Sequence, residues 1–429
     1  MSRNWKKDII FFLASQTISL FGSSLVQYAI TWYITLETQS GIMMTISIIC
    51  GFLPTFFLSP FAGVWADRYN RKVLIALSDS LIALSTLVMA VFFLAGYDAM
   101  WLLFAISAIR AFGSAVQMPA ISAILPQIVP EEKLTKVNAT NSSMQSLVML
   151  VSPMVSGALL SVATIESIFF IDVITAAIAV AIMVFFLHVP SHEKAMSKQT
   201  VSYFGDMYKG YEYIKSHGFI KAYFAFSAVF FVLIAPASFL TPLQVTRSFG
   251  NDVWRLTITE ISFSGGMMLG GIIMASWGGF RNKVHTMIFS NFVIALATVA
   301  LGVIPILPDF SAGILSGNFG INILFWIYMF FMLLTGVVVP IFNTPATVLL
   351  QERVEPDFLG RVFGIFGMIS STMMPLGMLI FGPVADIIRI EWLLIGTGLL
   401  LLVQSIFMLK SKDLVEAGEP VAEVEGGFV

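Results

Sequence analysis

Long apolar segments recur along the whole chain and constrain its fold more than any other feature of the sequence. Each segment has about 20 or more mostly apolar residues, the length of helix that crosses a bilayer. Lipid offers no hydrogen bonds, so only helices or closed barrels satisfy the backbone there, and barrel strands alternate in polarity, which these segments do not. The segments cover residues 9–36, 42–66, 73–96, 100–127, 138–163, 167–189, 219–246, 255–279, 284–307, 319–350, 359–385 and 392–409.

The composition excludes a water-soluble fold. Of the 429 residues, 58% are hydrophobic and 11% are charged, whereas soluble domains carry about 25% charged residues. The net charge of −2 and the lack of a long basic tract give no indication of nucleic acid as a partner. The sequence therefore predicts an all-α, polytopic membrane protein of about twelve transmembrane helices, surrounded by membrane lipid.

Basic residues indicate the orientation, because Lys and Arg near membrane ends gather on the cytoplasmic side. If both termini are inside, all but four of the 23 basic residues fall at inner ends or in inner loops. The exceptions are Arg247, Arg255 and Arg389 in outer loops, and Arg110 within a helix. The first segment is too long for a signal-peptide core, so it is interpreted as a membrane helix. We expect a multi-pass protein of the plasma membrane with cytoplasmic N- and C-termini.

The longest inner connection divides the helices into two sets of six. Its side chains Phe204, Met207, Tyr208, Tyr211 and Ile214 recur at helical spacing, which predicts an amphipathic helix at the membrane surface. The expected organisation is a six-helix bundle over 1–189, a cytoplasmic linker over 190–218, a second six-helix bundle over 219–411 and a cytoplasmic tail over 412–429.

The two halves share a short sequence pattern. Pro119 and Pro130 in the first half recur with the same offset as Pro345 and Pro356 in the second. Parallel repeats of this kind are typical of alternating-access transporters, in which two bundles rock around a site at the midplane of the membrane. The pattern favours two pseudo-symmetric bundles.

Polar side chains lie at helical spacing within three of the apolar segments. Lipid would leave such faces unsatisfied, so they meet either each other or a water-filled cavity. For a single Ser, packing between helices is the more common explanation. The candidates for a substrate cavity are Gln27 and Ser23 in the first segment, Gln117 in the fourth, and Asn141 and Gln145 in the fifth.

Arg110 and Gln27 share a depth near the midplane. Each lies ten residues from the outer end of its segment, which is about 15 Å at the rise of a helix. A central Arg costs about 3 kcal/mol even on the lenient insertion scale. We therefore expect Arg110 to lie in a cavity with partners and to serve function rather than packing.

The intramembrane acids lie at shallower depths. Asp172 and Glu260 are about 9 and 7 Å from the outer face, and Asp79 is about 10 Å from the inner face. A carboxyl group removed from water holds its proton more readily, which makes Asp172 and Glu260 candidates for proton coupling together with Arg110. For Glu260, stabilisation of a helix N-terminus is an equally good explanation. Asp79 is expected to be an internal hydrogen-bonding group near the gate.

A dense cluster of charges joins the second and third segments. The loop contains Asp67 and, at the positions that surround it, Gly63, Arg68, Arg71 and Lys72. Gly63 permits close approach of helices, and Asp67 is placed to accept hydrogen bonds from the helix N-terminus near Gly360. That contact would latch the two halves together on the inner side. A plain positive-inside turn explains the basic residues but not the spacing between Gly63 and Asp67.

The sequence contains no catalytic or metal-binding constellation. The four His residues lie at inner membrane ends or in the linker, without Cys or carboxylate groups at metal-ligand spacing, and no Walker loop is present. The single Cys50 lies in an apolar segment, where a small buried hydrophobe is the expected role. We expect no enzymatic activity, no metal and no cofactor, with a proton gradient as the energy source.

The charged loop resembles the best-known signature of the major facilitator superfamily, Gly-x-x-x-Asp-Arg-x-x-Arg-Lys. It is matched at Gly63, Asp67, Arg68, Arg71 and Lys72. Other stretches are similar to the macrolide efflux branch of that superfamily, including 51–54, 258–263 and 359–363. The resemblance extends through nearly the whole chain.

The resemblance implies the major facilitator fold and an antiporter that expels macrolide antibiotics from a bacterial cell in exchange for protons. It also implies that Arg110 belongs to a helix-four motif for proton coupling and that the Asp67 loop controls the inner gate. The helix-five motif of drug antiporters, Gly-x-x-x-Gly-Pro-x-x-Gly-Gly, is matched only in part, with Ser152, Pro153 and Gly157 at its positions. The corresponding loop in the second half of the chain, residues 278–283, has no Asp at the matching position. The resemblance therefore implies that the two halves control the gate asymmetrically.

The function expected from these observations is proton-coupled export of a small amphiphilic substrate by alternating access. An exporter of a siderophore, a lipid or another amphiphile on the same scaffold is the alternative. A multispanning membrane enzyme is more remote, because it needs a catalytic His or nucleophile pair at cavity depth. We expect a protein that functions as a monomer, and cooperation with an accessory ATPase is left open.

Overall fold

The protein is described here by a computed structural model, which covers residues 5–187, 189, 203–310 and 317–419. Within this part of the chain the regular elements are helices, and no strand is present. Twelve helical spans are long and apolar enough to cross a membrane. The predicted all-α architecture of about twelve transmembrane helices is therefore confirmed.

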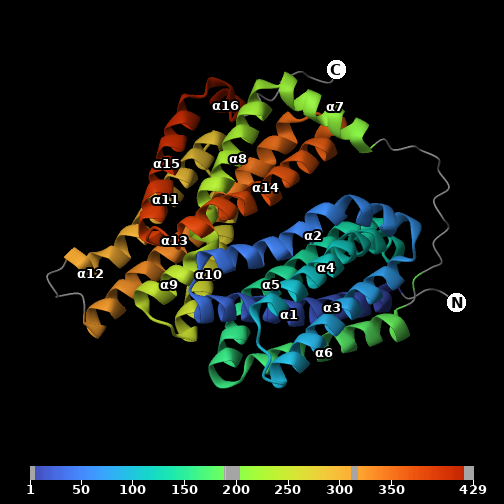
Figure 1. Cartoon of the computed structure of the whole chain (residues 1–429). Helices are drawn as coiled ribbons and strands as arrows, with labels where there is room; N and C mark the ends of the chain where they lie inside the picture. Colours follow the sequence, from blue (N-terminus) through green and yellow to red (C-terminus); the bar gives the residue numbers. More distant parts are fainter. Residues whose placement is uncertain (1–4, 188, 190–202, 311–316, 420–429) are drawn as a thin grey trace, which may run out of the picture. The chain divides into compact units, whose positions relative to one another are not determined.

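The chain divides into two compact units, of which the first contains Met1–Lys198 and Asn251–Glu260. Its helices are α1 (Trp5–Thr38), α2 (Gly41–Arg68), α3 (Arg71–Leu94), α4 (Met100–Ile128), α5 (Leu134–Val162) and α6 (Ile165–Ala181), with a 3₁₀ turn η1 (Glu131–Lys133) before α5 and a π-helical turn η2 (Ile182–Phe186) after α6. Helix α1 packs along α5 and α6, while α4 packs against α2 and α3 (Figure 1).

Short polar residues define the starts of two of these helices. The side chain of Ser40 accepts a hydrogen bond from the backbone N–H of Met43, and the side chain of Asn70 accepts from those of Lys72 and Val73. Such caps satisfy N–H groups that have no partner inside the helix. They therefore fix the two tight turns that bring α2 back against its neighbours.

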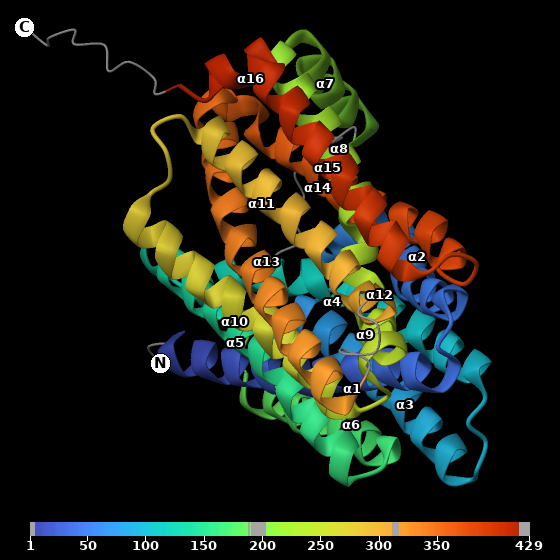
Figure 2. The same ribbon diagram turned by 90° about the vertical axis from the view of Figure 1, so that its left-hand side faces the viewer.

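The second unit contains Gln199–Gly250 and Ile261–Val429. Its elements are α7 (Tyr203–Ser216), α8 (Gly218–Phe239), α9 (Thr241–Phe249), α10 (Val253–Trp277), α11 (Lys283–Val303), η3 (Ile304–Ile306), α12 (Leu307–Phe310), α13 (Asn318–Arg353), α14 (Pro356–Val384), α15 (Ile390–Lys410) and α16 (Lys412–Ala417). The first residues of α10 are grouped with the first unit. Helix α11 lies between α13 and α15, and α8 packs against α14 and α15 (Figure 2).

The predicted single segment 219–246 is two helices in the structure. Helix α8 ends at Phe239 and α9 begins at Thr241, with Pro236 inside α8 and Pro242 in the first turn of α9. A proline has no N–H to donate, so it suits the first turn of a helix and disturbs the interior. Both prolines therefore favour the break between α8 and α9.

Two segments expected at the inner surface contain helices that pack on the second unit. In α7, Tyr213 and Ile214 are buried, and the ring of Tyr213 stacks on that of Phe358 with 4.3 Å between centroids. Of the predicted apolar stripe, Ile214 is thus buried and Tyr211 is exposed. The side chains of Phe204, Met207 and Tyr208 lie outside the described residues.

Helix α16 lies in the segment that the sequence predicts to be a tail. Its Leu414 is fully buried, and the side chains of Asn282 and Arg353 donate hydrogen bonds to the carbonyls of Val415 and Ala417, both at 2.9 Å. The predicted domain boundaries at 189, 218 and 411 stay predictions.

Candidate functional site

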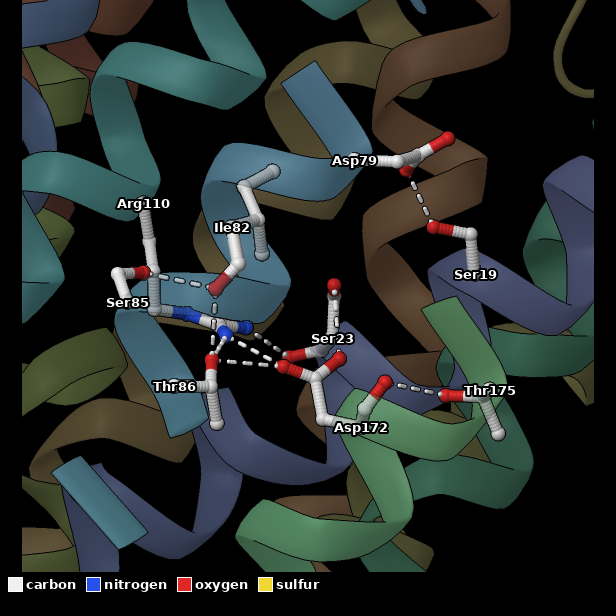
Figure 3. Close-up of polar contacts among 9 residues, drawn as sticks. All are labelled: Ser19, Ser23, Asp79, Ile82, Ser85, Thr86, Arg110, Asp172 and Thr175. Carbon is white, nitrogen blue, oxygen red and sulfur yellow. Dashed lines mark hydrogen bonds and ion pairs between the residues drawn. The ribbon is translucent and has the colours of Figure 1, made fainter. Parts of the chain in front are cut away.

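A buried ion pair joins two helices inside the first unit. Nη1 of Arg110, on α4, lies 2.6 Å from Oδ2 of Asp172, on α6, and the two side chains are 8% and 0% exposed (Figure 3). The sequence predicts that Arg110 has partners without naming them. Its partner in the structure is Asp172, which is one of the candidates for proton coupling. Helical rise alone puts the two residues at different depths, and the length of the Arg side chain closes that difference.

Two further helices complete the hydrogen bonds of the pair. Thr86 of α3 donates to Asp172 Oδ2 at 2.9 Å and also accepts from Arg110. Ser23 of α1 donates to Asp172 Oδ1 at 3.2 Å, and its carbonyl accepts from Arg110 Nη2 at 3.1 Å. We call these four residues the ion-pair cluster. It ties together α1, α3, α4 and α6.

The approach of α1 to α6 depends on Gly22. A Cβ added there would lie 2.0 Å from Thr175 Oγ1 and 3.1 Å from the Cα of Asp172. Only a glycine allows the two helices to come this close. Ser23, the next residue of α1, thereby reaches both Asp172 and Arg110.

Sequence reasoning missed Thr86 and Gly22. A signal for Thr86 was present, because Asp79 and Thr86 are seven residues apart and so share one face of α3. Gly22 had no such signal. Its role depends on which helix packs against it, and the sequence does not specify that helix.

A polar cavity lies beside the ion-pair cluster in the first unit. It is lined by side chains of α1, α4 and α5, and its polar lining consists of Gln16, Thr17, Ser19, Ser23, Ser114, Gln117, Asn141 and Gln145. Four of the five predicted cavity residues, Ser23, Gln117, Asn141 and Gln145, are thus brought together. The fifth, Gln27, is exposed and is not among the lining residues.

The cavity is small and its lining carries no formal charge. Its volume of about 80 Å³ is well below the 300–1,000 Å³ of a pocket for a drug-sized ligand. Within the first unit it can hold a polar group or a few waters, but not a whole amphiphile. Nε2 of Gln16 is buried without a hydrogen-bond partner, so the cavity wall has a donor to offer.

Asp79 connects to this cavity through two of its lining residues. Ser19 Oγ donates to Asp79 Oδ1 at 2.6 Å, and Gln117 Nε2 donates to the same oxygen at 2.8 Å. Figure 3 shows the Asp79 and Ser19 side chains directed toward each other, apart from the ion-pair cluster. Asp79 is therefore an internal hydrogen-bonding group, as the sequence predicts.

The basic residues of the charged loop bind backbone carbonyls. Arg71 donates to the carbonyls of Ala66 and Ala123, each at 2.9 Å. Lys72 Nζ donates to the carbonyls of Val184 and Leu187 at 3.0 and 2.7 Å. Cations at helix C-termini satisfy free carbonyls and interact favourably with the helix dipole. Arg71 and Lys72 thus connect the ends of α2, α3, α4 and η2 that lie at the charged loop.

The remaining residues of the predicted gate are Gly63, Asp67, Arg68 and Gly360, and their described contacts do not test the predicted latch. Arg68 is exposed, and a Cβ added at Gly63 would meet no atom within 4 Å, so the described residues do not show close approach there. The side chain of Asp67 lies outside the described residues. Gly360 lies one turn inside α14, which begins at Pro356. The latch between Asp67 and the region of Gly360 stays a prediction.

The residues at the helix-five motif positions are buried in α5. Ser152 and Pro153 are buried, and a Cβ added at Gly157 would lie 1.8 Å from Thr257 Oγ1, which belongs to the same unit. One turn along, Ser156 donates to the carbonyl of Leu25 at 3.1 Å. These small residues pack α5 closely against its neighbours.

Glu260 lies well inside a helix. It is the eighth residue of α10, which has no acidic residue in its first turn. The helix dipole acts within about one turn of the helix end, so stabilisation of the N-terminus does not explain Glu260. The structure does not bring Glu260 into the ion-pair cluster or the polar cavity.

Metal-binding chemistry has no support in the described part of the chain. No group of three or more His, Cys, Asp or Glu residues that could hold a metal ion is found there. Cys50 is a free thiol of intermediate exposure.

Comparisons with known proteins agree with this architecture. A sequence profile described as Major Facilitator Superfamily matches residues 12–378. Macrolide efflux protein A of Streptococcus pyogenes is 30% identical over 399 residues, which cover 93% of this chain and 94% of that protein. The Staphyloferrin A transporter of Staphylococcus aureus is 22% identical over 387 residues, which cover 89% of this chain and 90% of that protein.

A solved structure shares the fold. A bacterial homologue of the human lysosomal transporter Spinster aligns with a TM-score of 0.68 and 13% identity, over 98% of this chain and 100% of that chain. At this identity the likeness concerns the fold alone. It extends across all of the helical spans described above.

Proposed function

The chain belongs to the Major Facilitator Superfamily, and from that premise we propose that it exports amphiphilic drugs of the macrolide type in exchange for protons. It is a multi-pass membrane transporter. The observation that carries the proposal is the pairing of two features in one bundle. A buried Arg110–Asp172 ion pair lies beside a polar cavity, and both share Ser23.

The lining of the cavity supports a substrate that is polar without being strongly anionic. Hydroxyl and amide groups of Ser, Thr, Asn and Gln both donate and accept hydrogen bonds, which suits hydroxyl, ether and amine groups. Arg110 does not line the cavity, and its guanidinium is bonded to Asp172 and Ser23. The cavity is too small for a whole macrolide, so we assign it the polar end of the substrate. Apolar contacts then hold the remainder.

A proton gradient is sufficient as the energy source. One charge crossing 100 mV gains about 2.3 kcal/mol, which corresponds to about a fifty-fold gradient of a neutral substrate. A monocation exchanged for one proton moves no net charge, so only the pH difference drives it. The proposal includes no cofactor and a transporter that works as a monomer.

A siderophore exporter on the same scaffold is the second candidate. The similarity to the Staphyloferrin A transporter favours it. Iron chelators present several anionic oxygen donors, since hard cations prefer oxygen ligands. The uncharged cavity lining offers such a molecule no cation, which is the reason that we prefer the macrolide-type substrate.

The location follows from the class of protein. We propose the plasma membrane of a bacterium, with both termini on the cytoplasmic side, as the distribution of Lys and Arg indicates. Proteolysis of the C-terminal segment in right-side-out and inverted membrane vesicles tests this orientation.

Transport by the purified protein tests the proposed function. Vesicles that contain the protein are given an acidic lumen, and a labelled macrolide is added outside. We expect the vesicles to accumulate the macrolide as protons leave, and a protonophore to abolish the accumulation. Protein-free vesicles serve as the control. Accumulation of an iron-free siderophore instead of the macrolide would establish the second candidate.

A further inference from the structure

Asp79 is a buried carboxyl group that forms no ion pair with the part of the chain that the structure describes. It is 1% exposed, its Oδ1 accepts hydrogen bonds from Ser19 and Gln117, and its Oδ2 has no hydrogen-bond partner. A carboxylate is an acceptor on both oxygens, whereas a carboxylic acid carries a hydrogen on one. Oδ2 is therefore the atom with room for a proton.

Asp172 differs from Asp79 because both of its carboxylate oxygens accept hydrogen bonds. Its Oδ2 binds Arg110 and Thr86, and its Oδ1 accepts from Ser23. Neither oxygen of Asp172 is thus left open as Oδ2 of Asp79 is.

The groups that face Asp79 leave its charge uncompensated. Arg110 of α4 is paired with Asp172 of α6, and no ion pair between Arg110 and Asp79 is found among the described residues. From α1 the facing groups are Ser19 and Gln16, which are uncharged. The other charged residues of α3 and of the helices packed against it lie at helix ends, namely Lys6, Lys7, Asp8 and Glu37 on α1, Asp67 and Arg68 on α2, Arg71 and Lys72 on α3, and Glu166 on α6.

We propose that Asp79 carries the exchanged proton and that a cationic group of the substrate, held in the polar cavity, displaces it. Ser19 and Gln117 line the cavity and also hold Asp79, so a cation in the cavity lies one hydrogen-bonded side chain away from the carboxyl group. Either a proton on Oδ2 or the cation neutralises the charge. Because the two compete, binding of one releases the other.

The proton balance of this step is simple. A protonated Asp79 loses its proton to water as the cationic substrate binds, and the carboxylate takes up a proton when the substrate leaves. No bond other than O–H changes. The inference rests on the proposed function, because it names the group that couples the two fluxes. The chemical class of ligand is an amphiphile with a protonated amine.

Proton release on binding is the direct test. Purified protein in weakly buffered solution near neutral pH is mixed with a macrolide that carries a basic amine, and a pH indicator reports released protons. We expect the wild type to release protons. Asp79→Asn, which resembles the protonated form, should bind the macrolide more weakly and release none. Ser80→Ala is the matched control, since Ser80 is the next residue of α3 and bonds only to the carbonyl of Ala76. Release by Asp79→Asn equal to the wild type overturns the inference.

Vesicle assays separate this inference from the proposed function. A gradient of one pH unit supports about a tenfold concentration ratio if one proton is exchanged per molecule. We expect the wild type to show this accumulation and Asp79→Asn to lose it. If the wild type transports no macrolide, the proposed function fails. If the wild type does so and Asp79→Asn still accumulates it, the assignment of Asp79 fails.

A measurement on the unaltered protein covers the case in which Asp79→Asn does not fold. Dicyclohexylcarbodiimide reacts with protonated carboxyl groups in membranes, and mass spectrometry identifies the labelled residue. We expect labelling of Asp79 that rises as pH falls and that the macrolide prevents. Labelling of Asp172 or Glu260 with Asp79 unmodified would transfer the role to that residue.

Discussion

At the scale of single residues, the ion-pair cluster gives Arg110 polar partners, whereas the sequence also placed Arg110 in a cavity that it does not line. The membrane makes an unpaired Arg costly, and Arg110 has a carboxylate, a hydroxyl and a carbonyl as partners. Loss of one charge from such a pair leaves the other buried without compensation, which costs about 3–5 kcal/mol. The cluster is therefore required for stability whatever its role in transport.

This reasoning leads to a prediction for the pair. Arg110→Ala should lower the free energy of unfolding by about 3–5 kcal/mol and abolish pH-driven transport, because Asp172 is left as an isolated charge. The double variant Arg110→Ala/Asp172→Ala should recover most of the stability, since no buried charge remains. We expect its transport to stay low, because the bonds that hold Ser23 at the cavity wall are lost. Thermal unfolding in detergent and vesicle uptake are the measurements. Wild-type transport by the double variant would limit the pair to a structural role.

At the scale of helices, close contacts decide which side chains meet. Gly22 allows α1 to approach α6, and Gly266 and Gly336 do the same for α10 and α13 in the second unit. A Cβ added at Gly336 would lie 2.1 Å from the carbonyl oxygen of Phe263. Small residues at helix crossings are typical of membrane bundles, where packing rather than hydrophobic burial holds helices together.

A substitution at Gly22 tests this dependence. Gly22→Ala should separate α1 from α6 and lower the free energy of unfolding by about 1–3 kcal/mol, the usual effect of overpacking. Adding Thr175→Ala should restore part of the stability, because Thr175 Oγ1 is the nearest clashing atom. Gly51→Ala is the matched control, since its Cβ would meet nothing within 4 Å. Equal thermal stability of Gly22→Ala and Gly51→Ala would contradict the proposed contact.

At the scale of the whole molecule, each unit has to keep its shape if the bundles are to alternate. In the first unit, Arg71 and Lys72 connect four helical elements at the charged loop. In the second, α16 packs against α8, α11 and α15 at the end of the described chain. Each set of contacts acts within one unit.

The contribution of α16 gives a prediction at this scale. Leu414→Ala removes a fully buried side chain, so we expect a loss of about 2–5 kcal/mol in the free energy of unfolding and reduced transport. Lys412→Ala, an exposed position on the same helix, is the control and should change neither. Thermal unfolding and vesicle uptake are measured together. If both variants behave like the wild type, α16 does not hold the second unit together.

The polar residues show what helical spacing specifies and what it leaves open. Ser23, Gln117, Asn141 and Gln145 were expected to share a cavity because helical spacing places them on faces that lipid would not accept, and the structure brings them together. Gln27 satisfies the same rule and lies outside the cavity. Spacing fixes the face of a helix, but the rotation of that helix in the bundle decides what the face meets.

The sequence by itself determined the number of spans, the all-α architecture and the residues that needed polar partners. Free energies of transfer into lipid add up residue by residue along a segment. The spans can therefore be predicted from each segment of the sequence without knowledge of its neighbours in space. Only the tertiary structure decided that Arg110 meets Asp172 and Thr86, and that Asp79 joins Ser19 and Gln117. These contacts join residues far apart in the chain. Each depends on how several helices pack at once, and no single segment encodes that packing.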